Sequence, residues 1–336
     1  MKSKKIRVLV VDDSLMFREV ITKGINLNPD IEVVGKSTDP FEARDKLLEL
    51  EPDIMICDVI MPKMNGVDFI RRLLPQYPIP VIVVSSSDNA VIDSLNAGAI
   101  DFVLKPNNNK LNEFIIELIE KIKIVAYSKV MIKKQIDNKD LNKKEELISN
   151  RIIAIGASTG GVEALNNILT RLPQNVPGIV VVQHIPPVFS KMFAQRLNNQ
   201  LNLNVKEAQT GDVIEPGKVL IAPGNNHMRV KKYQNKFIVE IFQDKRVNGH
   251  CPSVDILFES VAKEVGNKSI GIILTGMGYD GAKGLLEMKK RGARTIGQDE
   301  KSSVVYGMPK VAYEIGAVEK KAPLANIPEI LLSMLK

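Results

Sequence analysis

The amino-acid sequence predicts two α/β domains, one in each half of a 336-residue chain. The chain is too long for one ordinary domain and long enough for two separate cores. Short β-branched runs alternate with amphipathic helical patterns in residues 1–126 and again in residues 151–336, which is typical of parallel sheets with crossover helices. Between them, residues 127–150 are rich in Lys, Asp and Asn, as expected of a solvated linker.

The first domain is predicted to contain a five-stranded parallel sheet. Strands are expected at residues 6–11, 31–36, 54–57, 81–85 and 101–105. Helices are expected to begin near Ser14, Pro40, Asn65 and Ala90, and a fifth covers residues 111–126. Near-continuous apolar strands such as residues 81–84 indicate a sheet covered on both faces.

The second domain is predicted to be a doubly wound α/β domain that carries a β-hairpin insertion. Its expected strands are residues 151–156, 178–184, 270–275 and 294–297. Hairpin-like segments interrupt this series between residues 212 and 243.

The composition is that of a globular protein and not of a disordered or fibrous one. Apolar residues make up 44% and charged residues 25% of the chain, which is close to the globular average. No apolar run approaches the ~18 residues that span a bilayer, so we expect a cytoplasmic protein without membrane insertion. Cys57 and Cys251 lie in different halves without metal or redox spacing, and are expected to be reduced packing residues.

The positive charge lies in the second half, where 24 Lys and Arg face 16 Asp and Glu in residues 151–336. Such a balance fits nucleic acid, an anionic surface or an acidic protein partner, and charge alone does not choose among them.

Polar side chains follow four strands of the first domain, at the sheet edge where open α/β folds bind ligands. Asp12 and Asp13 follow the first strand, Asp58 the third, Ser85 the fourth and Lys105 the fifth. Three clustered carboxylates repel one another unless a cation lies between them, and hard oxygen ligands suit Mg²⁺. Helix capping explains one such residue readily, but not five in register.

This pattern resembles the receiver domains of two-component response regulators. The resemblance covers residues 6–126 and rests on Val-Val-Asp-Asp-Ser at 10–14, Asp58, Met-Pro-Lys-Met-Asn-Gly at 61–66, Ser85 and Lys105-Pro106. It implies a flavodoxin-like fold. It also implies that Asp58 accepts a phosphoryl group from a histidine kinase, that Asp12 and Asp13 hold Mg²⁺ beside it, and that Ser85 and Lys105 contact the phosphoryl oxygens.

In the second domain, the first strand runs into Gly-Ala-Ser-Thr-Gly-Gly at 156–161, just before a helix. Such a turn either cradles phosphate with its N–H groups or presents Ser158 as a nucleophile beside an oxyanion hole. The spacing matches neither the dinucleotide fingerprint nor the P-loop. It is close to the esterase elbow G-x-S-x-G, although the surrounding topology is not an obvious α/β-hydrolase.

Residues elsewhere favour the nucleophile, because a serine needs a base. His184 ends the next strand, and Asp280 follows the strand at 270–275. Ser158, His184 and Asp280 therefore form a plausible triad at one sheet edge. As alternatives, His184 could be a turn or core histidine and Asp280 a helix N-cap. His227 and His250 are the rival bases, and His250 is expected to line the substrate cleft without being the base.

Backbone N–H groups beside the serine are the expected oxyanion donors. They are those around Ser158, Thr159 and Gly160, together with Met277 and Gly278 after the strand at 270–275.

The second domain resembles the protein-glutamate methylesterase domain of bacterial chemotaxis in residues 156–161, Gln183-His184, the segments around His227 and His250, and residues 275–281. With the receiver-like first domain, the chain is similar to the response regulators of the CheB family. The resemblance implies hydrolysis of γ-glutamyl methyl esters on the cytoplasmic helices of chemoreceptors, release of methanol, and deamidation of receptor glutamines, with no cofactor for the esterase. It also implies that the unphosphorylated receiver obstructs the active site. Cys251 departs from the family pattern, which is expected to have a basic residue after His250.

Two other functions are open from the sequence. Receivers are often fused to DNA-binding domains, but the second half shows no compact helix-turn-helix signature, so no nucleic acid is expected. The second domain could also be a non-catalytic docking or nucleotide-binding module.

Overall fold

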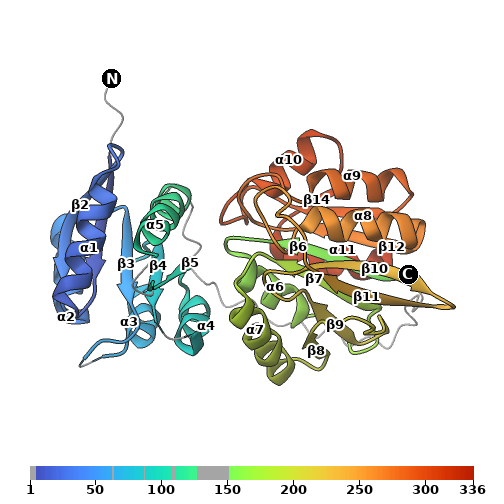
Figure 1. Cartoon of the computed structure of the whole chain (residues 1–336), viewed down its shortest axis with the longest axis horizontal. Helices are drawn as coiled ribbons and strands as arrows, with labels where there is room; N and C mark the ends of the chain where they lie inside the picture. The colour runs from blue at the N-terminus through green and yellow to red at the C-terminus, as the bar shows by residue number, and fades with distance from the viewer. Residues whose placement is uncertain (1–4, 63, 87, 107–109, 127–150) are drawn as a thin grey trace. The chain divides into compact units, whose positions relative to one another are not determined.

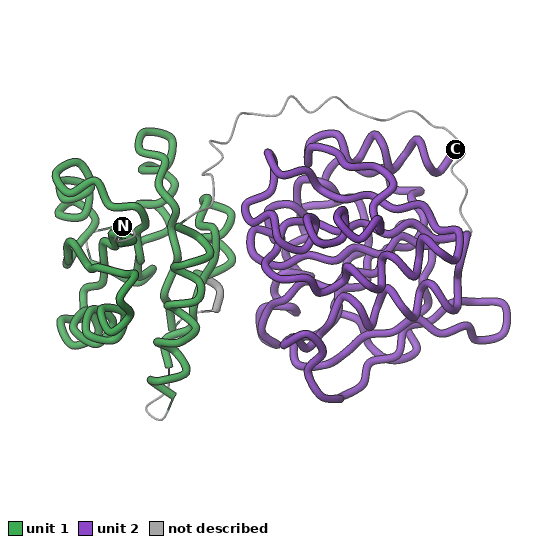
Figure 2. Tube along the Cα trace, turned by 90° about the horizontal axis from the view of Figure 1, so that it is seen from above, with its two compact units in different colours: residues 1–134 green, residues 135–336 purple. Residues whose placement is uncertain are grey.

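The structure is a computed structural model that describes residues 5–62, 64–86, 88–106, 110–126 and 151–336. The chain divides into two compact units, residues 1–134 and 135–336 (Figure 2). The linker predicted at residues 127–150 lies outside the described residues. Across the described part of the chain, no helix is long and apolar enough to cross a membrane.

The first unit is a five-stranded parallel sheet in the order β2-β1-β3-β4-β5, which is the flavodoxin-like order. Its strands are β1 (Ile6–Val11), β2 (Ile31–Ser37), β3 (Ile54–Asp58), β4 (Val81–Ser85) and β5 (Asp101–Leu104). Its helices are α1 (Leu15–Asn26), α2 (Pro40–Leu50), α3 (Gly66–Leu73), α4 (Asp88–Ala97) and α5 (Leu111–Ala126).

Polar residues at the strand ends start three of these helices. The side chains of Ser14, Asp39 and Asn65 accept hydrogen bonds from the first backbone N–H groups of α1, α2 and α3, as N-caps do. α1 packs beside α5, whereas α3 packs beside α4 (Figure 1). The sheet is thereby covered on both faces, which explains its apolar strands.

The second unit contains a seven-stranded parallel sheet in the order β14-β13-β12-β6-β7-β9-β8. Its strands are β6 (Ile152–Ala157), β7 (Gly178–Gln183), β8 (Asn204–Glu207), β9 (Lys218–Ile221), β12 (Ser269–Ile273), β13 (Arg294–Gln298) and β14 (Lys320–Ala322). A separate antiparallel hairpin is formed by β10 (His227–Tyr233) and β11 (Lys236–Phe242).

The helices of this unit are α6 (Gly161–Leu169), α7 (Pro187–Gln200), α8 (Val254–Glu264), α9 (Ala282–Lys290), α10 (Met308–Glu314) and α11 (Ile327–Met334), with 3-10 turns at Gly266–Lys268 and Leu324–Asn326. α8 and α9 lie side by side against β6 and β12, and α8 also packs on the hairpin strand β10 (Figure 1).

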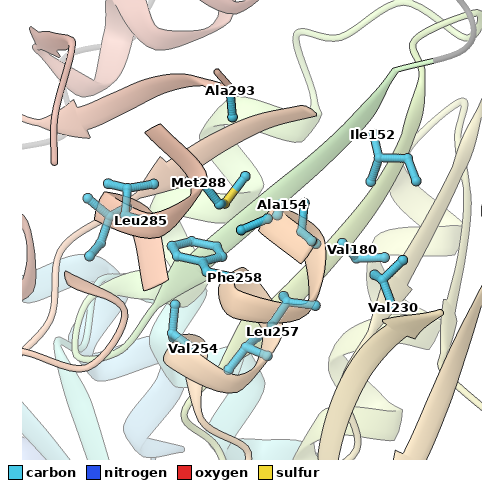
Figure 3. Packing of buried hydrophobic residues seen from close by; sticks show 14 of the residues in the cluster. Ile152, Ala154, Val180, Val230, Val254, Leu257, Phe258, Leu285, Met288 and Ala293 are labelled. Atoms are coloured by element: carbon cyan, nitrogen blue, oxygen red, sulfur yellow. The ribbon is translucent and has the colours of Figure 1, made fainter. Parts of the chain in front are cut away.

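One part of the core of the second unit lies beneath α8. Phe258 and Val254 from α8 meet Met288 from α9, Ala154 from β6 and Val180 from β7 (Figure 3). Each of these five side chains is fully buried. Because this layer holds α8 against the sheet, it also fixes the N-terminus of α8 near the ends of β6 and β12.

The structure confirms the predicted fold class in both units and moves some boundaries. The expected strands at 6–11 and 81–85 are observed unchanged, whereas the others shift by one or two residues at one end or, for the strands expected at 151–156 and 270–275, at both ends. β9 falls inside the segment expected to be hairpin-like but joins the parallel sheet between β7 and β8. The hairpin itself is confined to β10 and β11.

Candidate active site and acidic pocket

Ser158 lies in the turn between β6 and α6. Its backbone N–H donates to the Thr275 carbonyl at 3.0 Å, and its own carbonyl accepts from Gly161 N at 2.7 Å. Gly160 has a left-handed φ of 75°, which glycine adopts without steric cost. The turn therefore holds the serine at the carboxyl end of the sheet, half-exposed.

His184 follows β7, the strand beside β6. The register pairs Ala157 with Gln183, and His184 N donates to the Ala157 carbonyl at 3.1 Å. Ser158 and His184 are thus the next residues along two adjacent strands, which are about 4.8 Å apart in parallel sheets.

The imidazole of His184 is paired with Asp280. His184 Nε2 lies 2.9 Å from Asp280 Oδ2. The other ring nitrogen, Nδ1, is buried and has no hydrogen-bond partner among the described residues. Ser158 Oγ makes no hydrogen bond to this ring in the described structure, and catalytic hydrogen bonds are often long without substrate. Nδ1 is therefore the ring nitrogen that remains open to a further hydrogen bond.

Asp280 is 1% exposed and is held by donors from the start of α8. Its Oδ1 accepts from Asn248 Nδ2 at 2.8 Å and from Ser253 Oγ at 2.8 Å, and its Oδ2 accepts from Val254 N at 2.7 Å. Burial by itself raises the pKa of Asp280, but the bond to His184, followed by those from Asn248 and Val254 N, lowers the pKa well below its usual range. The carboxylate therefore stays ionised in a buried site.

Asp280 does not cap the helix that follows it. The N-cap of α9 is Gly281, which makes no side-chain cap. The alternative that Asp280 is a helix N-cap is thus wrong, because its oxygens are taken by α8 and His184.

The two rival histidines have different surroundings. His227 is fully buried, with Nε2 3.0 Å from the Lys245 carbonyl and Nδ1 accepting from Ser253 N at 3.2 Å. Both of its nitrogens are occupied, so His227 is not available as a base. His250 stacks on His184 with ring centroids 3.8 Å apart and an interplanar angle of 10°.

The segment after β12 lies against the serine turn. A Cβ added at Gly276 would lie 2.6 Å from Ser158 Cβ, so only glycine permits this approach. Met277 and Gly278 follow and are exposed, and a Cβ at Gly307 would lie 3.0 Å from Gly278 N. The N–H groups of Gly160, Met277 and Gly278 donate to no other described residue, and are free to bind an oxyanion.

Sequence reasoning missed several residues that support this site. Gln183 Nε2 donates to the Ser158 carbonyl at 2.9 Å, while Asn248 and Ser253 hold Asp280. The Asn-Gly dipeptide at 248–249 is a strong signal for a tight turn, but nothing in the sequence relates that turn to Asp280.

The structure also brings together the predicted acidic residues of the first unit. Carboxylate oxygens of Asp12, Asp13 and Asp58 lie within 4.8 Å of one another. Lys105 Nζ lies 2.7 Å from Asp12 Oδ2 and 2.6 Å from Asp58 Oδ2. Ser85 is fully buried at the end of β4.

In this pocket, burial and the neighbouring charges act on the pKa values in opposite directions. Burial raises the pKa of Asp58 despite the ammonium group of Lys105 beside it. Burial disfavours the charge of Lys105, but its bonds to Asp12 and Asp58 outweigh this and raise its pKa. Oxygen donors alone, with Asp13 exposed to solvent, fit a Mg²⁺ ion that keeps some of its waters.

Comparisons with known families account for both units. The CheB methylesterase family matches residues 153–331, and the response regulator receiver domain matches residues 8–116. The chain belongs to the CheB methylesterase family.

Full-length members of this family are similar to the chain from end to end. A protein-glutamate methylesterase/protein-glutamine glutaminase of Syntrophomonas wolfei is 51% identical, with 100% of this chain and 99% of the relative covered. A protein of the same name from Syntrophotalea carbinolica is 47% identical, with 99% and 98% covered.

A solved CheB structure matches the second unit. The methylesterase catalytic domain of Thermotoga maritima CheB is 40% identical, with a TM-score of 0.54, and covers 56% of this chain and 100% of that one. This leaves the alternatives of a DNA-binding or non-catalytic second domain without support.

Proposed function

We propose that this chain is a phosphorylation-controlled protein-glutamate methylesterase, which hydrolyses γ-glutamyl methyl esters and deamidates glutamines on chemoreceptors. The observation that carries the proposal is the 2.9 Å contact between His184 Nε2 and Asp280 Oδ2, with the ring's Nδ1 left without a hydrogen bond and Ser158 following the adjacent strand. This is the arrangement of an orienting carboxylate, a general base and a nucleophile.

In the first half of the reaction, Ser158 Oγ attacks the ester carbonyl carbon while His184 Nδ1 takes the serine proton. The resulting tetrahedral intermediate collapses, the C–O bond to the methoxy group breaks, and His184 returns the proton to release methanol. Asp280 holds the ring through Nε2 and stabilises its charged form.

In the second half, a water molecule attacks the γ-glutamyl ester on Ser158, again with His184 as the base. The bond to Ser158 Oγ breaks, His184 returns its proton to the serine, and the glutamic acid side chain is released and ionises by losing the remaining proton of the water to solvent. With a glutamine substrate the first leaving group is ammonia, and the later steps are the same.

The negative oxygen of each tetrahedral intermediate needs donors. The N–H groups of Thr159, Gly160, Met277 and Gly278 are the proposed set, and His250 is proposed to line the same cleft. Loss of one such donor typically lowers kcat ~10²-fold or more.

The receiver is proposed to control this chemistry through phosphorylation of Asp58. Asp12, Asp13 and Asp58 would hold Mg²⁺, which neutralises phosphoryl oxygens when bound. We propose that Lys105 and Ser85 contact those oxygens. The phosphodonor would be a chemotaxis histidine kinase, and the substrates cytoplasmic helices of chemoreceptors, so we propose a cytoplasmic location.

The test is methanol release from a methylated receptor fragment. The wild-type chain should release methanol, and Ser158→Ala should lower kcat by roughly 10⁴-fold or more while leaving Asp58 phosphorylation intact. Ser302→Ala, which removes another half-buried serine of the same unit, is the control and should retain activity. Methanol release by Ser158→Ala at the wild-type rate would contradict the proposed nucleophile.

A further inference from the structure

Residues 247–250 form a tight turn beside the candidate triad. Val247 N donates to the His250 carbonyl at 3.0 Å, and His250 N donates to the Val247 carbonyl at 2.9 Å. The two central residues, Asn248 and Gly249, have left-handed φ values of 52° and 84°. A two-residue turn with positive φ at both positions favours Asn-Gly, so the sequence itself fixes this shape.

The amide of Asn248 lies between two buried carboxylates. Its Nδ2 donates to Asp280 Oδ1 at 2.8 Å and to Asp255 Oδ2 at 2.7 Å. Asp255 is 3% exposed, and its other oxygen accepts from Gly284 N at 2.7 Å. Because Nδ2 carries two N–H groups, the amide serves both carboxylates at once and has a single orientation.

The Asn248 amide also offsets the repulsion between the carboxylates of Asp255 and Asp280. Burial raises the pKa of Asp255, the charge of Asp280 raises it further, and the bond from Asn248 acts against both. Asn248 and Ser253 together occupy Oδ1 of Asp280. Rotation of the carboxyl group would break these bonds, so Oδ2 remains aimed at His184.

The last residue of the turn covers the imidazole. The His250 ring lies parallel to the His184 ring at 3.8 Å. Burial, with the neighbouring His184 next in effect, lowers the pKa of His250 to about 4. Near pH 7 His250 is therefore an uncharged plane against one face of His184.

We infer that the turn at residues 247–250 is a clamp on the His184–Asp280 pair. Asn248 is a positioning residue for Asp280, and His250 is a positioning residue for His184. The inference rests on the proposed function, because it assigns these two residues to the same reaction. Neither residue donates or accepts a proton in the steps above. Each restricts how the pair can rotate, so removing either should slow the chemical step, and removing the Asn248 amide should leave substrate binding unchanged.

The main variant is Asn248→Gly in the full-length chain. Glycine keeps the left-handed turn and removes only the amide. We expect kcat for methanol release to fall by about 10- to 100-fold, as misplacement of a catalytic group does, with KM within about twofold of wild type. Asn248→Asp, which keeps the shape but replaces the donor, should lose kcat to at least the same extent.

A matched control is available in the neighbouring hairpin. Gln234 has a φ of 53° in the two-residue turn between β10 and β11, and it is exposed. Gln234→Gly makes the same kind of backbone change without touching Asp280, and should leave kcat unchanged. Thermal unfolding of each variant identifies any that fail to fold.

The stacking role of His250 is tested by two substitutions. His250→Phe keeps a planar ring and should retain kcat within about threefold, whereas His250→Ala should lose about tenfold. Equal losses in both variants, or wild-type kcat in Asn248→Gly, would overturn the clamp.

A second readout separates this inference from the proposed substrate. The rate at which a serine-directed phosphonate labels Ser158 depends on the triad and not on a methyl ester. If the wild type is labelled but releases no methanol, the proposed function fails, and slower labelling of Asn248→Gly still supports the clamp. Equal labelling rates in wild type and Asn248→Gly would refute it.

Discussion

Asp280 is a buried carboxylate whose charge depends on the hydrogen-bond donors around it. Its two oxygens accept from Asn248, Ser253, His184 and the backbone N–H groups of Val254 and Asp255. A buried carboxylate without such donors would take up a proton. These donors come from three separate segments, so Asp280 stays ionised only while the folded second unit holds those segments together.

We predict that protonation of Asp280 contributes to acid unfolding. The pKa of Asp280 is lower in the folded chain than its ordinary value, so its contribution to stability is complete above the ordinary value and is lost as the pH falls toward the folded one. Between about pH 5 and pH 2, the free energy of unfolding of the second unit should fall more steeply in wild type than in Asp280→Asn.

Urea unfolding midpoints across that pH range measure the difference. Glu300→Gln, which removes an exposed carboxylate of the same unit, is the control and should follow the wild-type slope. Equal slopes in wild type and Asp280→Asn would show that Asp280 does not drive the acid transition.

The sequence predicted these individual residues unequally well. Ser158, His184 and Asp280 were predicted as a group because strand ends in a parallel sheet meet at one edge. The exclusion of His227 needed coordinates, because only packing shows that both of its nitrogens are already bonded. Asn248 was not found, because its partners Asp255 and Asp280 follow at later positions on other segments.

Among the elements, the strand-to-helix turn at Ser158 and the loop after β12 depend on each other. Gly276 is the point of closest approach, since a Cβ there would lie 2.6 Å from Ser158 Cβ and 2.4 Å from Met308 Sδ. A side chain at this position must push the serine turn or the start of α10 away.

We therefore predict that Gly276→Ala lowers kcat for methanol release by roughly 10²-fold, through displacement of Ser158 from the oxyanion donors. The measurement is steady-state kinetics on a methylated receptor fragment. Gly271→Ala on β12 is the matched control, because the atoms nearest to its Cβ would be the side-chain ends of Leu285 and Met288. Gly271→Ala should cost stability but retain kcat, and equal kcat losses in both variants would contradict this account.

Elements near the edge of the second sheet were harder to predict than those at its centre. β6, β7 and β12 are long, apolar and buried, and their periodicity is clear. β8 and β14 are short and partly exposed, and β9 has four residues. Such strands exist because a neighbour offers backbone hydrogen bonds, which local sequence does not encode.

At the scale of the whole molecule, two separate cores correspond to two separate chemistries. One buried cluster is drawn from residues 6–125 and the other from residues 152–318. Phosphorylation at Asp58 and ester hydrolysis at Ser158 are therefore expected to be separable by mutation, and linked only through an equilibrium that phosphorylation shifts.

We predict that a small-molecule phosphodonor with Mg²⁺ raises methanol release by the wild-type chain, by roughly 5- to 150-fold if the coupling is of ordinary size. EDTA should abolish the response but leave the basal rate unchanged, since Ser158, His184 and Asp280 need no metal. Asp58→Asn should keep the basal rate without a response. A basal rate that falls with EDTA would contradict the proposed metal-free esterase.

The sequence alone determined the class of each half, because hydrophobic period and strand-end residues are local properties that survive in the one-dimensional pattern. It also determined the candidate nucleophile, its base and the carboxylate that orients the base, and the acidic pocket around Asp58. Only the tertiary structure decided which histidine pairs with Asp280, which of its nitrogens makes that contact, and how Asn248 and His250 surround the pair. Those features depend on side chains that meet across distant segments, and the packing of α8 against the sheet is what brings them together.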